Sequence, residues 1–345
     1  MQPKEQTGNR GQLAVQAHEV WSQEQWRLFE SQNGRDVLDA TDDELARKVT
    51  SRSGRRVLRS YSSSFYAVTR FLPQAKRADV EMVYAAVRYP DEIVDTFDLS
   101  ASFKTVLIDG WLDDYQRSAQ FPTIREAVAA GIPATLAGLR DVLRRNSIPD
   151  AYYVDFITTM RRDVSPRRFI DWDDLIENYI YGSATVVGYF LAHIYGASVD
   201  RTIDDCLRGA RSLAIALQLT NFARDVADDS ARSRCYLPVD KVDMDGNPLV
   251  PLVLEGDPGS IAQAKLLLAE EAAVWYERAE ADLSAFKPDS RVAIDSCHRL
   301  YSALNTRILQ SRSPFDRESL SFWRKLSVLP RSKYWRLPAA MVLER

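Results

Sequence analysis

Two pairs of aspartates constrain this chain more than any other feature of its sequence. Asp91 is followed four residues later by Asp95, and Asp225 is followed four residues later by Asp229, each pair within a largely apolar stretch. On a helix this spacing stacks the two carboxylates on one face, one turn apart. Because two like charges there destabilise the helix, we expect a cation between them, and Mg²⁺ prefers carboxylate oxygens completed by water and phosphate.

Polar neighbours of the two pairs favour a phosphate-binding site. Tyr84 and Arg88 lie on the helical face of the first pair, and Gln218 and Asn221 precede the second pair at helical spacings. Arg88 and Arg224 can hold phosphate oxygens beside a metal ion. Two such helices facing each other would bind a metal-bridged diphosphate. The alternative is two solvated acidic faces, since charged residues are mostly exposed, but two copies within apolar helices favour the metal site.

The composition excludes several classes of protein. A formal net charge of -3 does not suit a nucleic-acid binder. The three cysteines and three histidines are scattered without metal-ligand, redox or triad spacing, which indicates a reducing compartment and gives little support for zinc. The polar N-terminus lacks a secretory signal, and the longest apolar stretch, 184–195, is shorter than the roughly 20 residues that span a bilayer. We therefore expect a soluble, cytoplasmic protein.

Apolar periodicity predicts an all-α chain whose core helices line a cavity. Residues 1–50 are predicted to form a leader, with an amphipathic helix over 12–30 that Gly34 ends and a short helix capped by Thr41. Further helices are predicted over 55–72, 75–95, 107–117, 122–143 with a break at 131–133, 150–162, 172–195, 204–229, 260–285 and 291–310, with a loop over 240–259.

Three local features bear on the site. The serine run 62–64 suits a helix end or the wall of a polar cavity, because hydroxyl groups compete for backbone hydrogen bonds. Pro90 removes a helical hydrogen bond directly before Asp91 and is expected to bend the helix there. Gly182 and Gly188 cost helix stability, which indicates close approach either by another backbone or by an elongated apolar ligand.

The chain resembles the squalene/phytoene synthase family of isoprenoid enzymes from about Tyr61 to Pro238, and more weakly toward Lys325. Five motifs carry the resemblance, in the order that the family has them. They are Ser62-x-Ser64-Phe65 followed by Leu72-Pro73, Arg88-x-x-Asp91-x-x-x-Asp95, Tyr179 with a small-residue run to Gly188, Gln218-Leu219-Thr220-Asn221-x-x-Arg224-Asp225-x-x-x-Asp229, and Arg234-x-Tyr236-Leu237-Pro238.

The resemblance implies an isoprenoid-synthase fold, a helical bundle around a central cavity, with the catalytic domain over residues 51–345. It implies Mg²⁺, with Mn²⁺ as an alternative, bound to one prenyl diphosphate or two. It gives Tyr179 a role in ionisation and proton transfer. The metal-site positions are Asp91, Asp95, Asn221, Asp225 and Asp229. The positions that hold diphosphate or line its pocket are Ser62, Ser64, Phe65, Arg88, Gln218, Arg224, Arg234 and Tyr236.

The sequence departs from the usual family pattern at several positions. Tyr61 stands where a basic or small residue is common, and Pro90-Asp91-Glu92 replaces the more usual double aspartate while keeping the outer pair. Ser183 and Thr185 replace the usual valine and glycine in the small-residue run. That run is expected beside the prenyl chains, so these changes leave the chain length and the second substrate open.

The leading hypothesis is a Mg²⁺-dependent prenyltransferase that ionises an allylic diphosphate and joins it head to head with a second prenyl diphosphate. The first alternative moves the prenyl group onto an aromatic or heteroaromatic acceptor in specialised metabolism, which the altered 183–185 run favours. A non-catalytic relative that binds prenyl diphosphate and a terpene cyclase are further alternatives. The basic, aromatic tail from residue 311 is expected to cap the domain or, at most, to make peripheral membrane contact.

Overall fold

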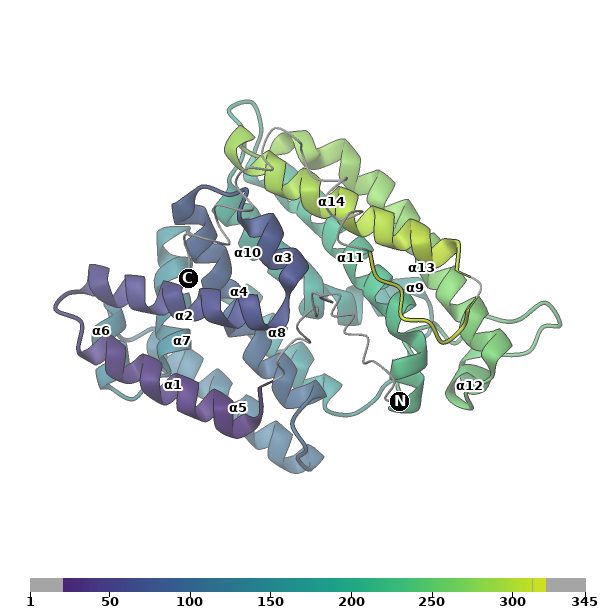
Figure 1. Cartoon of the computed structure of the whole chain (residues 1–345), viewed down its shortest axis with the longest axis horizontal. Helices are drawn as coiled ribbons and strands as arrows, with labels where there is room; N and C mark the ends of the chain where they lie inside the picture. Colours follow the sequence, from purple (N-terminus) through teal and green to yellow (C-terminus); the bar gives the residue numbers. More distant parts are fainter. Residues whose placement is uncertain (1–20, 312, 321–345) are drawn as a thin grey trace, which may run out of the picture.

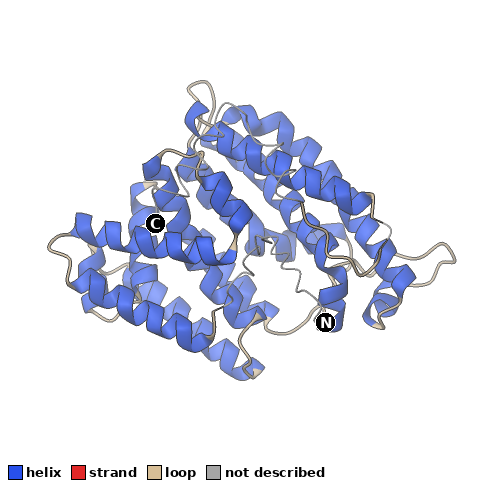
Figure 2. Ribbon diagram, viewed as in Figure 1, coloured by secondary structure: helices blue, strands red, loops and turns tan. Residues whose placement is uncertain are grey.

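Helices account for all the regular secondary structure in the computed structural model, which describes residues 21–311 and 313–320 (Figure 2). Apart from them, the described chain contains only isolated β-bridges. The predicted all-α class is therefore confirmed. The helices are α1 (Gln23–Leu38), α2 (Asp43–Tyr61), α3 (Ser63–Thr69), α4 (Gln74–Asp95), α5 (Ala101–Ser118), α6 (Ile124–Ala129), α7 (Ala134–Arg145), α8 (Asp150–Asp163), α9 (Trp172–Leu175), the π-helix η1 (Ile176–Thr185), α10 (Val186–Tyr195), α11 (Ile203–Ala231), α12 (Leu249–Leu254), α13 (Pro258–Asp282), the 3₁₀ turn η2 (Leu283–Ala285) and α14 (Pro288–Leu309).

The N-terminal helices differ from their predicted bounds. α1 begins later than predicted, after a capping box formed by Ser22 and Gln25. It continues through Gly34, which was wrongly predicted to end it, because the buried Val37 lies beyond the glycine and extends the apolar contact. Asp42, not Thr41, caps α2 by accepting a hydrogen bond from the Leu45 amide at 2.8 Å. Residues 12–20 of the predicted first helix lie outside the described residues.

α1 belongs to the same hydrophobic core as the helices that follow it. Its Trp26, Phe29 and Val37 are buried against that core, and α1 packs on α2, α6 and α7 (Figure 1). Residue 50 lies in the middle of α2. The division into a leader and a catalytic domain at residue 50 stays a prediction, and this packing argues against an independent leader.

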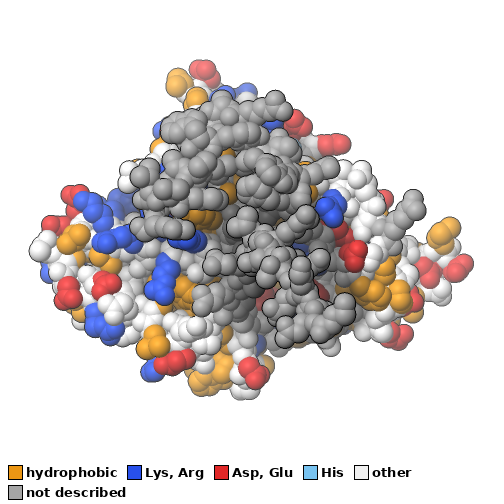
Figure 3. All heavy atoms as spheres, viewed as in Figure 1, with side chains coloured by type: hydrophobic (Ala, Val, Ile, Leu, Met, Phe, Trp, Pro, Cys, Tyr) orange, Lys and Arg blue, Asp and Glu red, His pale blue; other side chains and the backbone are white. Residues whose placement is uncertain are grey.

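α2 is amphipathic, which explains why it forms and how it is oriented. Ala46, Val57 and Leu58 are buried on its inner side. Basic side chains cover its outer side at helical spacings, and Figure 3 shows Lys and Arg gathered there. The exposed basic residues of α2 are Lys48, Arg52, Arg56 and Arg59.

The second half of the chain is built around α11. α13 packs along its length, α10 and η1 cover another side, and α14 lies beside α13 (Figure 1). The predicted loop over 240–259 contains the short helix α12, so that prediction is wrong for 249–254. None of the helices within the described ranges has both the length and the apolar character needed to cross a bilayer. The predicted capping or membrane role of the tail falls mostly on residues 321–345, outside the described residues.

The helix predicted over 172–195 is three elements, with the π-helix η1 in its middle. A Cβ on Gly182 would lie 1.8 Å from the Thr159 hydroxyl of α8, and one on Gly188 would lie 3.0 Å from the Ala210 carbonyl of α11. The first distance excludes a side chain unless Thr159 moves, and the second is tighter than most Cβ contacts. Of the two explanations for these glycines, close helix packing is the one that the structure supports at both positions.

α4 continues through Pro90 to Asp95. Proline cannot donate to the carbonyl four residues before it, here that of Ala86. The Tyr153 hydroxyl of α8 donates to this carbonyl at 2.7 Å and accepts a hydrogen bond from the Trp111 indole at 2.9 Å. Tertiary contacts therefore satisfy the group that Pro90 leaves free, directly before the first aspartate pair.

Candidate active site

A mainly apolar cavity of about 340 Å³ is lined by residues of α3, α4, α8, η1, α10, α11 and α14. One part of its wall is polar, with Arg88 and Asp91 from α4 and Gln218 and Asn221 from α11. Phe65 of α3 also lines it. Its apolar wall includes Val68, Phe156, Leu191, Phe286, Ile294 and Cys297. A cavity of this kind suits a long hydrocarbon chain with a polar head beside the aspartates.

Guanidinium groups hold the first aspartate pair. Arg88 donates to Asp91 at 2.5 Å and also pairs with Glu92. Burial raises the pKa of the Asp91 carboxyl to about 7, with Asp95 and Glu92 adding to the rise and Arg88 opposing it. Asp95 ends α4 and pairs with Arg234, which follows the second aspartate helix. Arg234 therefore links the two predicted motifs directly.

The second pair divides into two different environments. Arg224 bonds to Asp225 at 2.5 and 2.9 Å, and Arg317 bonds to the same carboxylate at 2.7 Å. Although burial opposes them, these bonds lower the pKa of Asp225. Burial raises the pKa of Asp229 to about 7, and the charges of Asp225 and Asp95 add to the rise. The Arg234 amide donates to the Asp229 carbonyl at 2.9 Å while its guanidinium pairs with Asp95, so this one residue contacts both pairs.

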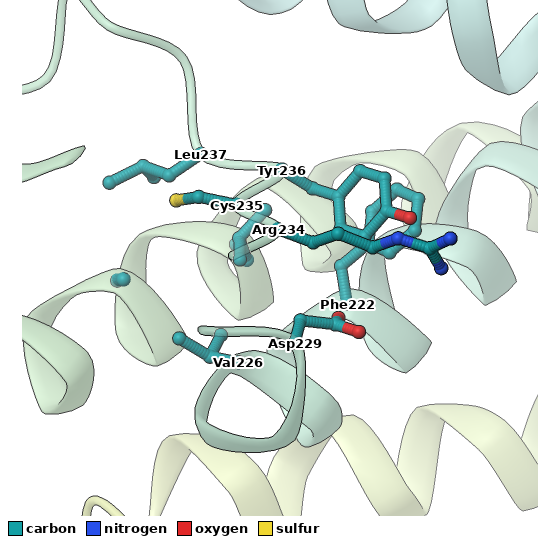
Figure 4. A pocket seen from close by; sticks show the side chains of 9 residues that line it. Phe222, Val226, Asp229, Arg234, Cys235, Tyr236 and Leu237 are labelled. Carbon is teal, nitrogen blue, oxygen red and sulfur yellow. The ribbon is translucent and has the colours of Figure 1, made fainter. Parts of the chain in front are cut away.

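Aromatic rings stack beside the second pair (Figure 4). The rings of Phe222 and Tyr236 are nearly parallel, 4.0 Å between centroids. In Figure 4 the Arg234 side chain extends alongside them, above the Asp229 carboxylate. These four residues are among those that line a small pocket of about 10 Å³.

Tyr179 is buried in the π-helix η1 and donates a hydrogen bond to the Asp163 carboxylate at 2.7 Å. Its hydroxyl oxygen lies 3.3 Å from that of Tyr236. Burial, together with Tyr236 and Asp163, raises the pKa of the Tyr179 hydroxyl well above its usual range. The hydroxyl is therefore protonated at neutral pH. A π-helix widens the turn at this point, as it frequently does at functional sites.

The remaining predicted site residues lie on the cavity wall or at the start of α3. Phe65, Gln218 and Asn221 line the cavity. The Ser62 hydroxyl caps α3 by accepting from the Phe65 amide at 3.2 Å, which is the helix-end role predicted for the serine run. Ser64 lies in the first turn of α3. A phosphate-binding role for either serine stays a prediction.

The sequence reasoning missed two residues beside the site. Asp163 accepts the Tyr179 hydrogen bond, and its position was a signal, because an acid in the last turn of α8 opposes the helix dipole. Arg317 lies 92 positions after its partner Asp225, in a segment without helical periodicity. Local pattern carries no signal for such a pairing.

The oxygen donors around the aspartates suit Mg²⁺ chemically, since carboxylates and an amide are hard ligands. Within residues 21–311 and 313–320, however, no three His, Cys, Asp or Glu side chains lie close enough together to hold an ion. Arginines bond to Asp91, Asp95 and Asp225 instead. The predicted metal ligands thus stay a prediction.

The all-α bundle, with an apolar cavity whose wall includes Asp91, matches solved structures of the isoprenoid-synthase fold. The structure superposes on a dehydrosqualene synthase with a TM-score of 0.70 and 24% identity, covering 87% of this chain and 99% of the other. It also superposes on squalene synthase HpnC from Alicyclobacillus acidocaldarius with a TM-score of 0.64 and 20% identity, covering 79% and 97%. At these identities the likeness establishes the fold.

Sequence comparison gives the family. The family profile described as Squalene/phytoene synthase matches residues 58–327. A 15-cis-phytoene synthase of Paracoccus sp. (strain N81106 / MBIC 01143) is 31% identical over 266 residues, 75% of this chain and 82% of the relative. One from Pantoea ananas is 28% identical, covering 78% and 86%. The chain belongs to the squalene/phytoene synthase family, a family of head-to-head prenyltransferases that typically uses Mg²⁺.

Proposed function

We propose that this chain is a Mg²⁺-dependent prenyltransferase that ionises an allylic prenyl diphosphate and condenses it with a second prenyl diphosphate. The observation that carries the proposal is the apolar cavity whose polar wall is formed by Arg88, Asp91, Gln218 and Asn221, with one arginine contacting both aspartate pairs. Hydrocarbon and diphosphate thus each have a matching surface.

The proposed reaction begins with loss of diphosphate from carbon 1 of the allylic substrate. Bound Mg²⁺, held by Asp91, Asp95, Asn221, Asp225 and Asp229, would neutralise charge on the leaving group. Arginines at the site already bond to carboxylates, Arg224 through two nitrogens to Asp225, and guanidinium groups can bind phosphate oxygens in the same way. Electrostatic stabilisation of this kind is usually the largest single contribution to catalysis. The residues assigned to this task are Arg88, Arg224 and Arg234.

The allylic cation that remains must be kept from water. The carbon-rich cavity wall offers water few hydrogen-bond partners, and the faces of aromatic rings attract a cation. Phe65 lines the cavity, and Phe222 and Tyr236 stack beside the second aspartate pair. The protonated Tyr179 hydroxyl, oriented by Asp163, is assigned the proton-transfer role. Attack by the double bond of the second prenyl chain on carbon 1 forms the carbon–carbon bond, and the diphosphate released in the first step takes up the proton that is then lost.

A second prenyl diphosphate is the acceptor that the relatives favour, because the named sequence relatives are phytoene synthases. The cavity wall is also predominantly carbon, as a prenyl acceptor requires. The hydroxyl of Ser183 on that wall is the one observation that suits an aromatic or heteroaromatic acceptor. That second candidate gains weight only if prenyl donors alone give no coupled product.

Product analysis by mass spectrometry tests the proposal. Purified protein is incubated with Mg²⁺ and, in turn, dimethylallyl, geranyl, farnesyl or geranylgeranyl diphosphate. The Asp225→Ala, Asp229→Ala double variant is the inactive comparison, and Asp204→Ala, exposed on the same helix, is the matched control. We expect a coupled hydrocarbon or cyclopropyl diphosphate from the wild type and from Asp204→Ala only. Diphosphate release without coupling from every donor would overturn the head-to-head assignment.

A further inference from the structure

The N-terminal helix α1 reaches the first aspartate motif through a single tyrosine. The Trp21 amide and the Trp26 indole N–H both donate to the hydroxyl oxygen of Tyr61, each at 3.0 Å. Trp21 is 5% exposed and Trp26 is 1% exposed, so both donor residues are buried, while Tyr61 is partly exposed. The Trp26 and Tyr61 rings also stack, 6.0 Å between centroids. Hydroxyl and ring together fix the orientation of Tyr61.

Tyr61 in turn supports Arg88. The Arg88 guanidinium carbon lies 4.5 Å from the centre of the Tyr61 ring, which is the geometry of a cation–π contact. The same guanidinium donates to Asp91 at 2.5 Å and pairs with Glu92. The Tyr61 ring thus lies against the guanidinium whose nitrogens reach these carboxylates. Where the ring lies determines where the arginine can lie.

The contacts begin outside the part of the chain that matches the family. The family match starts at residue 58, whereas Trp21 and Trp26 lie well before it. Tyr61 is also where the sequence departs from the basic or small residue common in the family. The departure and the additional helix are therefore structurally connected, because the tyrosine hydroxyl accepts both hydrogen bonds from the N-terminal segment.

We propose that Trp21 and α1 form an intramolecular positioning element that holds Tyr61, and through it Arg88, in the arrangement needed to bind the substrate diphosphate. Tyr61 and Trp26 are positioning residues, because they act through Arg88. The inference rests on the proposed function and assigns to the N-terminal extension a part in diphosphate binding at that same site.

The contacts that run from Trp21 and Trp26 through Tyr61 to Arg88 are called the relay below. Two substitutions test it in the full-length protein. Tyr61→Phe keeps the ring but removes the acceptor of both hydrogen bonds, and the milder Trp26→Phe removes one donor. Tyr115→Phe is the matched control, because Tyr115 makes the same two kinds of contact. The Arg140 guanidinium carbon lies 4.2 Å from the centre of its buried ring, and its hydroxyl donates to Asp150 at 2.8 Å. Arg140 does not line the cavity. Binding of inorganic pyrophosphate with Mg²⁺ is measured by calorimetry well below each unfolding midpoint, together with KM and kcat for the prenyl diphosphate.

We expect all three variants to lower the unfolding midpoint, because each removes a hydrogen bond that a buried residue donates. Only Tyr61→Phe and Trp26→Phe are expected to raise the pyrophosphate Kd and the KM, by about two- to tenfold, the effect of misplacing one charged hydrogen-bond donor. Unchanged Kd in both variants, or an equal rise in Tyr115→Phe, would overturn the relay. A wild type that fails to bind pyrophosphate would overturn the proposed function itself, and the relay with it.

Discussion

Ser183 places a hydroxyl group on the wall of a cavity that is otherwise mostly carbon. The oxygen is buried and has no hydrogen-bond partner among the described residues. Removing an unpaired buried hydroxyl restores a small favourable desolvation, whereas removing a paired one strands its partners. We expect Ser183→Ala to leave the free energy of unfolding unchanged or to raise it by up to about 1 kcal/mol, measured by urea denaturation.

The control for Ser183→Ala is Ser118→Ala. The buried Ser118 hydroxyl donates to the Tyr115 carbonyl at 2.5 Å and accepts from Arg140 at 3.0 Å. Its loss is expected to cost about 1–3 kcal/mol. Equal destabilisation by the two substitutions would show that Ser183 has a hydrogen-bond partner in solution.

Individual site residues were predictable only where a short-range pattern carried them. Asp91 and Asp225 could be identified because each has a second aspartate one helical turn away. The link between Arg234 and Asp95, and that between Arg317 and Asp225, join distant parts of the chain. Such pairings depend on how helices pack, and no local spacing encodes them.

At the scale of single elements, α4 depends on α8 at the point where proline interrupts its hydrogen bonds. The Tyr153 hydroxyl satisfies the freed Ala86 carbonyl and also accepts the Trp111 hydrogen bond. We expect Tyr153→Phe to destabilise the protein by about 1–3 kcal/mol, because it leaves the buried Ala86 carbonyl and the buried Trp111 indole N–H unpaired. Thermal unfolding measures this effect. The double variant with Pro90→Ala, which restores the backbone donor, should recover part of the loss, and no recovery would contradict the explanation.

A second prediction concerns the packing of α1 on α7. Glu30 of α1 accepts hydrogen bonds from the amide and hydroxyl of Thr135, in the first turn of α7. Burial raises the pKa of the Glu30 carboxyl above its ordinary value of 4.5, although the Thr135 bonds oppose the rise. The folded state thus holds this proton more tightly than the unfolded state. Stability therefore falls as the pH rises from 4.5 through the raised pKa.

Glu30→Gln removes this titration. The variant is expected to gain stability relative to the wild type as pH rises above about 4.5. Denaturant unfolding at several pH values measures the difference, and Glu277→Gln, an exposed glutamate on α13, provides the control. Parallel pH profiles for the wild type and Glu30→Gln would exclude Glu30 as the cause.

The existence of most helices was predictable, and their details were not. Apolar periodicity placed α4 and α11 within two residues of their bounds. The same reasoning wrongly ended α1 at Gly34. The helix continues because the glycine penalty of about 1 kcal/mol is smaller than the free energy gained by burying Val37 beyond it. The π-helix η1 was not foreseen, since π-helices are rare and occur mostly as short segments inside α-helices.

For the molecule as a whole, a buried lysine attaches the C-terminal segment to α13. The Lys265 ammonium, in a side chain 3% exposed, donates to both Glu318 oxygens at 2.8 and 3.0 Å and to the Asp316 carbonyl at 2.8 Å. This segment places Arg317 on Asp225. We expect Lys265→Met to cost about 3–5 kcal/mol, because it leaves a buried carboxylate unpaired.

Hydrogen exchange provides the readout for Lys265→Met. Exchange should accelerate in residues 313–320 but not in α5, and pyrophosphate affinity should fall because Arg317 is no longer held. The double variant Lys265→Met, Glu318→Leu removes both charges and should recover most of the stability. Unchanged exchange in 313–320 would show that other contacts hold the segment.

The overall architecture and the cavity were predictable as a class, because all-helical chains with facing aspartate motifs have few alternative arrangements. What the sequence could not supply is how the terminal segments join the site. Trp21 donates to the Tyr61 hydroxyl, whose ring contacts Arg88, and Arg317 in the segment 313–318 bonds to Asp225. Both connections join positions tens of residues apart, and they depend on tertiary packing alone.

The arginine partners of the aspartates have a consequence for the order in which ligands bind. Asp91, Asp95 and Asp225 each hold a guanidinium in this structure. A divalent cation that takes these carboxylates must release the arginines, and each released guanidinium then needs another anion. The substrate diphosphate is that anion. Metal and diphosphate are therefore expected to exchange partners in one cooperative event, in which each tightens the binding of the other by the same factor.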